Sequence, residues 1–234
     1  MLAIMKRELL SYFTSPLGYV FVAVFYLFSG IFLYLFTLYS QSADMSSVYI
    51  GMFFVMLIMI PILTMRLMAE ENRQKTDQLL LTSPVSLTRL VLGKFLSAFS
   101  ILVMCVLIFV VYGIVLSCFV DMNWAIIWGN IVGMLLLGAL CVSSGLFVST
   151  LTENQMIAAV GSIGLNIAFI LVDSFASVMP VKFLQDVFYS LSFYSRYNEF
   201  TLGIFSLSNV FFFVSVAFVF LFLTVRVLEK RRWS

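Results

Sequence analysis

Charged side chains are the groups in this chain whose types and spacing could do chemistry, and they concentrate in one stretch, Met65 to Lys94. Only 10% of all residues are charged, yet this stretch holds Arg66, Glu70, Glu71, Arg73, Lys75, Asp77, Arg89 and Lys94. Each would cost about 2.5–3.5 kcal/mol at the centre of a bilayer even on the most lenient insertion scale, so the stretch is expected to lie in water. This concentration of charge indicates a surface that could recognise another molecule through its charged groups.

Spacing within this stretch predicts a helix with its own ion pairs. Glu71 and Lys75 are four residues apart, as are Arg73 and Asp77, and Glu70 lies three residues before Arg73. Pairs at these spacings face each other on a helix and stabilise it slightly. We therefore expect a short, solvated, charged helix here.

Residue types required for catalysis are sparse. Histidine, the commonest general base, is absent, and the chain has no GxxxxGK[ST] phosphate loop for ATP hydrolysis. An intramembrane aspartyl protease needs two facing carboxylates, whereas Asp173 is the only acidic residue toward the middle or outer part of a long apolar run. Asp173 has two interpretations, a functional group or an anchor at the membrane surface. Three cysteines without CxxC spacing predict neither a zinc site nor a disulfide framework.

An apolar tip follows the charged helix. A solvated loop gains nothing from three consecutive leucines, here Leu79, Leu80 and Leu81. We therefore expect these side chains to be buried against a partner. Pro84 disfavours helix at Ser83, and Ser86 can cap a helix that restarts at Leu87. The stretch therefore predicts a helical hairpin built for docking. The alternative interpretation is a plain solvated loop between two spans.

Six apolar runs surround and position this hairpin. With 63% hydrophobic residues and a mean hydropathy of +1.13, the chain is predicted to be a polytopic, all-α membrane protein. Each run is long enough to cross a bilayer. The runs are about Leu17–Ser40, Val48–Met68, Leu90–Val120, Ala125–Thr150, Met156–Ser174 and Val210–Val227.

Lysine and arginine predict the orientation. With both termini in the cytosol, 11 of these residues lie on the inner side and only Lys182 and Arg196 lie outside, which is the asymmetry that multi-pass proteins show. The chain is therefore expected in a cell membrane, as in the bacterial cytoplasmic membrane. A net charge of +2 gives no basis for binding nucleic acid.

Four features inside this layout are candidates for special roles. Residues 1–15 are predicted to form an interfacial helix, and residues 175–209 to form extracytoplasmic amphipathic helices that dip into the outer leaflet without crossing. Pro61 should kink the second span, because it lacks a backbone donor. Asn130 and Asn166 are expected to hydrogen-bond between helices.

The hairpin sequence MRLMAEENRQKTDQLLLTSPVSLTRLVLGK resembles the ABC-2 type export permeases, which read approximately R-x-x-a-E-E-r-r-x-G-T-x-e-x-L-L-t-x-P-v-s-x-x-x-v-l-G-K there. The opening KRELLSYFTSPLGYV is also similar to the start of the gliding-motility-associated permeases within that family. This chain departs from the pattern at Lys75, where the family usually has glycine, and at Asp77 and Gln78.

The resemblance implies a single ABC-2 transmembrane domain over residues 1–234, of the type V exporter-like kind. It implies a coupling helix from Glu70 to Leu81 that docks a separate ABC ATPase subunit, with Glu153 to Gln155 as a second contact. Two permeases would pair, and spans two and five would line the path, with Pro61, Asn166 and Asp173 as path or gate candidates. The resemblance implies no catalytic residue, cofactor or metal in this chain, because ATP and Mg²⁺ belong to the partner ATPase.

Two other functions remain open from sequence. A non-transporting membrane subunit could transmit ATPase motion to an extracytoplasmic partner, although the short outer loops leave little surface for one. An ion channel lacks a charge ring or filter-like loop. For an exporter, the Phe, Met and Leu content of the spans favours an amphipathic, peptide or lipid-like cargo.

Overall fold

The computed structural model describes residues 2–41, 44–75, 86–178 and 192–233, and all regular structure in these ranges is helical. Six long apolar helical segments among them meet the length and hydropathy of membrane spans, as predicted. They are formed by α2 (Pro16–Leu33) with the π-helical turn η1 (Tyr34–Leu38), α3 (Ser46–Thr64), α6 (Leu87–Val106) with α7 (Ile108–Ser117), α8 (Trp124–Leu151), α9 (Gln155–Val178) and α12 (Leu207–Trp233).

Local signals in the sequence explain where several helices begin. Pro16 occupies the first turn of α2, after Ser15 in an extended conformation, where a missing N–H costs nothing. The side chain of Asn123 accepts a hydrogen bond from the Ala125 N–H and caps α8. The helix predicted to restart at Leu87 does so, with Ser86 at the cap position but without a side-chain cap bond.

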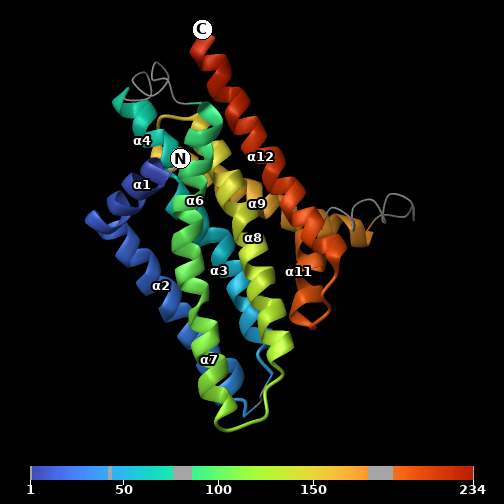
Figure 1. Ribbon diagram of the computed structural model, residues 1–234. Helices are drawn as coiled ribbons and strands as arrows, with labels where there is room; N and C mark the ends of the chain where they lie inside the picture. The colour runs from blue at the N-terminus through green and yellow to red at the C-terminus, as the bar shows by residue number, and fades with distance from the viewer. Residues whose placement is uncertain (1, 42–43, 76–85, 179–191, 234) are drawn as a thin grey trace.

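Helix α8 lies at the centre of the bundle and packs against α3, α6, α9 and α12 (Figure 1). Glycines allow its neighbours to approach closely. A Cβ at Gly138 would lie 2.0 Å from Leu102 Cδ2 of α6, and a Cβ at Gly145 would lie 2.1 Å from Thr64 Oγ1 of α3. Because glycine has no side chain at these two positions, α3 and α6 pack directly against the backbone of α8.

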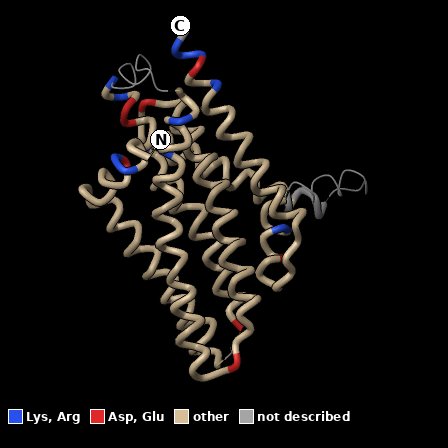
Figure 2. Tube along the Cα trace, in the orientation of Figure 1, with Lys and Arg blue, Asp and Glu red and all other residues tan. Residues whose placement is uncertain are grey.

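Both chain ends lie at the same end of the bundle, together with the short charged helix α4 (Arg66–Gln74) (Figure 1). Most of the charged residues drawn gather at this end, and few lie along the spans (Figure 2). The end of α7 and the starts of α3 and α8 lie at the opposite end (Figure 1). This is the arrangement expected of a chain that crosses a membrane six times and has both termini on the same side.

The segment 175–209 is described only in part, because residues 179–191 lie outside the described ranges. Helix α11 (Phe193–Thr201) has nine residues, too few to cross a bilayer. It packs against α3, α8 and α9 through the buried Phe193, Tyr197 and Phe200, and the Tyr197 hydroxyl donates to the Tyr49 carbonyl at 3.2 Å. Its predicted place in the outer leaflet remains a prediction.

Candidate docking surface and the contacts beneath it

Helix α4 continues from α3 after a one-residue break at Met65 and presents two different faces. Leu67, Met68, Ala69 and Asn72 are buried, whereas Arg73, Gln74 and Lys75 are exposed and Glu70 is half-buried. One face is therefore bound to the bundle while the other is open to a partner.

Lys75 ends α4 with a left-handed backbone, at φ 55° and ψ 20°. Glycine adopts this conformation without strain and is the preferred residue just beyond a helix. The structure thus explains the glycine of the ABC-2 pattern at this position. The described helix ends at Gln74, short of the Glu70–Leu81 range expected for the coupling helix, and Asp77, Leu79, Leu80 and Leu81 lie outside the described residues.

Ser149 of α8 holds the start of α4. Its Oγ accepts hydrogen bonds from the backbone N–H groups of Met68 and Ala69, at 3.1 and 3.0 Å, and donates to the Met65 carbonyl at 2.9 Å. The first N–H groups of a helix have no partner within it, so a buried hydroxyl here replaces the usual cap. The break between α3 and α4 is thereby attached to α8.

Asn72 joins α4 to the second inner loop. Its Nδ2 donates to the carbonyls of Thr150 and Thr152, at 3.4 and 3.3 Å, at the end of α8. The next residue, Glu153, is exposed, and Gln155 is half-buried at the start of α9. The structure therefore brings together the two parts predicted to contact the ATPase, the charged helix and the loop from Glu153 to Gln155.

A partly buried ion cluster joins α4 to two neighbouring helices. Lys94 of α6 is 1% exposed, and its ammonium contacts Glu71 Oε2 at 2.9 Å, Glu8 Oε1 at 3.4 Å and the Leu67 carbonyl. Arg7 of helix α1 (Leu2–Thr14) contacts Glu8 Oε1 at 2.8 Å and Glu71 Oε1 at 2.9 Å. The hydrogen bond to Glu8 raises the pKa of Arg7. Two cations and two carboxylates thus tie α1, α4 and α6 together.

A second set of polar contacts fixes α1 to the start of α4. Arg66 donates to Ser15 Oγ at 2.9 Å and to Ser11 Oγ at 2.6 Å, and its guanidinium lies over the Tyr12 ring at 4.8 Å. Tyr12 is fully buried, and its hydroxyl donates to the Leu63 carbonyl at 2.8 Å. The end of α3 is thereby attached to α1 just before Met65.

The ion pairs predicted within α4 differ from those in the structure. Glu71 reaches Arg7 and Lys94, which are distant in sequence. Within residues 66–75, no ion pair joins Glu70 to Arg73, and Glu70 accepts a hydrogen bond from Gln74 at 3.4 Å instead. A buried ammonium attracts a carboxylate more strongly than an exposed cation does, because water screens the exposed pair.

Two of the path or gate candidates, Pro61 and Asn166, affect the same backbone carbonyl inside the bundle, that of Leu57. Proline has no N–H, so the Leu57 carbonyl one turn earlier in α3 loses its helical partner. Asn166 Nδ2 of α9 donates to that carbonyl at 3.2 Å, and Ser144 of α8 donates to Asn166 Oδ1 at 3.2 Å. All three helices thus share one polar contact at the proline.

This contact predicts a thermodynamic coupling between the two residues. Asn166→Ala should destabilise the protein by about 1 kcal/mol, because the Leu57 carbonyl loses its donor within the membrane. The same change in a Pro61→Ala background should cost much less, since the alanine introduced there supplies the backbone N–H that proline lacks. A double-mutant cycle of unfolding in detergent micelles measures the difference. Additive effects would show that Asn166 does not substitute for the missing donor.

The other predicted polar positions have separate outcomes. Asn130 was expected to bond between helices, and this was wrong: its Nδ2 donates to the Ile126 carbonyl of its own helix at 2.9 Å. The backbone of Asp173 lies in α9, and its side chain is outside the described residues. No group of three metal-ligating side chains occurs in the part of the chain that the structure describes.

Sequence reasoning missed the residues that anchor α4, namely Glu8, Asn72 and Ser149. One signal was present for α1: Glu8, Ser11, Tyr12 and Ser15 follow helical spacing and form a polar stripe on one face. Such a stripe on a membrane-adjacent helix indicates polar partners. Ser149 offered no comparable signal, because serine in a span most often bonds its own helix.

Residues 6–173 match the model of a family described as ABC-2 family transporter proteins. The match covers 168 of 234 residues, and the chain therefore belongs to the ABC-2 family of transporter proteins. It is a multi-pass membrane component, a permease, of a kind that is typically non-catalytic. No curated protein matches the chain in sequence.

Proposed function

We propose that this chain is the permease subunit of an ABC exporter and docks a separate ATPase subunit through α4 and the loop from Glu153 to Gln155. The observation that carries the proposal is the anchoring of α4. Its buried face is bound to α1, α6 and α8, whereas its exposed face and Glu153 carry charges and lie at the end of the bundle with both termini (Figure 2). Because α4 is bound to three other helices, a displacement of its exposed face by a partner would be transmitted to them.

The anchoring suggests how motion would pass through the chain. Closure of two ATPase subunits would move both α4 surfaces together, and the contacts beneath them would carry the displacement into α6 and α8 as rigid bodies. The break at Met65, between α3 and α4, and the hydrogen bond from Asn166 to the Leu57 carbonyl of α3 lie on the same route. The charges of α4 would set the register of docking, while the apolar Leu79–Leu81 tip would fill a groove on the ATPase.

A second permease, identical or different, would complete the transport path. Phe54, Ile58 and Ile62 form an exposed stripe on the otherwise buried α3, and Ile157, Val160 and Ile167 form one on α9. Both stripes are apolar, in keeping with a permease partner and an amphipathic, peptide or lipid-like cargo. The finer resemblance to gliding-motility-associated permeases rests on the hairpin and opening residues.

Leu80→Asp tests the docking role. The substitution should abolish co-purification with the ATPase and the stimulation of its activity, because a carboxylate in an apolar contact is left without a partner. Membrane insertion should be unchanged. Phe119→Asp, at the exposed far end of the bundle, is the matched control and should leave the complex intact.

Co-purification of Leu80→Asp at the level of the unsubstituted protein would contradict docking through the hairpin. Substrate-stimulated ATPase activity of the complex in liposomes distinguishes an exporter from a subunit that only transmits motion, because the latter requires no cargo.

A further inference from the structure

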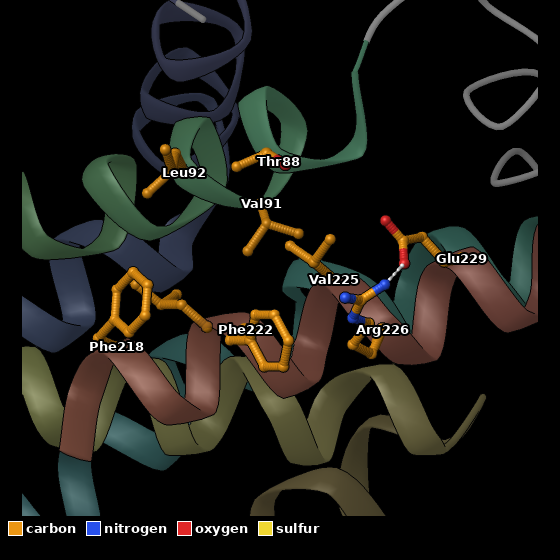
Figure 3. A pocket seen from close by; sticks show the side chains of 9 residues that line it. Thr88, Val91, Leu92, Phe218, Phe222, Val225, Arg226 and Glu229 are labelled. Atoms are coloured by element: carbon orange, nitrogen blue, oxygen red, sulfur yellow. Dashed lines mark hydrogen bonds and ion pairs between the residues drawn. The ribbon is translucent and has the colours of Figure 1, made fainter. Parts of the chain in front are cut away.

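A groove between α6 and α12 lies toward the end of the bundle that carries the termini. It encloses about 250 Å³ and is lined mostly by apolar side chains. Figure 3 shows side chains of both helices converging on the groove. Its lining includes Val91, Leu92, Phe218, Phe222, Val225 and Arg226. Both helices are candidate spans, so the groove borders the membrane.

One end of the groove is apolar and the other is charged. Phe218 and Phe222 lie along α12, and Arg226 follows one turn later, with its guanidinium 4.9 Å from the centre of the Phe222 ring. Arg226 Nη1 contacts Glu229 Oε2 at 2.8 Å, and the Arg226 side chain remains 61% exposed. Arginine has five N–H donors, so this contact leaves others available. Glu229 is followed directly by Lys230, Arg231 and Arg232, so the net charge of this end of α12 is strongly positive.

The size and position of the groove indicate what fills it. Protein interiors leave few voids larger than a water molecule, so an apolar hollow this large calls for an apolar occupant. From Phe218 to Arg226 the helix rises about 12 Å, close to the thickness of one leaflet's hydrocarbon. Cations at the membrane surface attract anionic headgroups.

We propose that this groove binds one anionic phospholipid of the leaflet at the terminal end of the bundle. An acyl chain lies against Leu92, Phe218 and Phe222, and the phosphate accepts hydrogen bonds from Arg226. Charge complementarity selects this occupant over a second copy of the chain, because two such basic ends would repel each other. Most of the groove belongs to α12, which lies outside the family match of residues 6–173.

Lipid retention by the full chain tests the proposal. The protein is reconstituted in nanodiscs of equal parts phosphatidylglycerol and phosphatidylcholine, and retained lipid is counted by native mass spectrometry. The unsubstituted chain should retain one phosphatidylglycerol molecule in preference to phosphatidylcholine. Arg226→Gln should lower that preference about tenfold, the loss expected for a hydrogen bond to a charged group. Leu92→Trp should fill the groove and release the lipid.

Matched controls separate this site from general surface charge. Lys230→Gln removes one cation outside the groove and should change the preference by only about twofold, because an exposed charge is screened. Val219→Trp places the same side chain on the exposed side of α12 and should leave retention unchanged. Equal effects of Arg226→Gln and Lys230→Gln, retention by Leu92→Trp, or a dimer without bound lipid would each overturn the proposal. Unchanged elution of every variant in size-exclusion chromatography confirms folding.

Discussion

Lys94→Met should destabilise the protein by about 3 kcal/mol, the largest effect of a single substitution that the structure predicts. Methionine keeps the length of the side chain but removes the ammonium that Glu71 and Glu8 share at 2.9 and 3.4 Å. Both carboxylates are mostly covered, with 17% and 13% exposure, so water replaces the lost partner poorly. Arg7 still contacts both carboxylates, and this keeps the loss at the lower end for a broken buried pair.

Denaturation of the purified protein in detergent micelles measures this loss. Lys75→Met removes an exposed cation beyond the end of α4 and should change stability by less than about 0.5 kcal/mol. Adding Glu71→Gln to Lys94→Met should recover part of the loss, because one unpaired carboxylate is removed. Equal stability of Lys94→Met and Lys75→Met would show that the cluster does not hold α4 in place.

Gly145→Ala should cost about 2 kcal/mol, within the range for overfilling a packed core. The new methyl would lie 2.1 Å from Thr64 Oγ1 and 3.1 Å from Thr64 Cβ, where the last residue of α3 packs against α8. The two helices would have to move apart. We therefore also expect weaker stimulation of the partner ATPase, since the position of α4 depends on this contact.

Two comparisons isolate that contact. Thr64→Ala removes the oxygen that the new methyl meets, so it should restore most of the stability of Gly145→Ala. Gly129→Ala is the matched control on the same helix, because nothing lies within 4 Å of its added Cβ. It should be neutral or slightly stabilising, since alanine favours helix over glycine. A loss at Gly129 as large as that at Gly145 would contradict the packing argument.

The spans and their number follow from sequence because long apolar runs encode them locally. The restart of helix at Leu87 could be predicted for the same reason, from Pro84 and Ser86. Ion pairing could not be predicted in the same way, because Glu71 finds Lys94 and Arg7 from other helices, and local spacing favours only neighbours such as Lys75. Long-range polar contacts depend on which helices pack together.

The hydrogen bond from Asn166 to the Leu57 carbonyl shows the same limit. Sequence reasoning identified Pro61 as a break in the hydrogen bonding of α3 and Asn166 as a donor between helices, but only the fold shows that one satisfies the other. The family pattern at Lys75 shows the converse case. The left-handed backbone there gives a physical reason for a glycine that the sequence could only note as missing.

Photo-crosslinking from position 73 identifies the protein that binds the exposed face of α4. Arg73 lies on the exposed face of α4, so a photoreactive amino acid placed there contacts whatever binds that surface in intact cells. If α4 docks the ATPase, one major adduct should contain an ABC ATPase subunit, and it should be lost when Leu80→Asp is added. The exposed Cys118 is first replaced by serine, so that a thiol reagent reports only on position 73. Labelling of Arg73→Cys in that background by a membrane-impermeant reagent added outside intact cells, with no ATPase adduct, would rule out docking through α4.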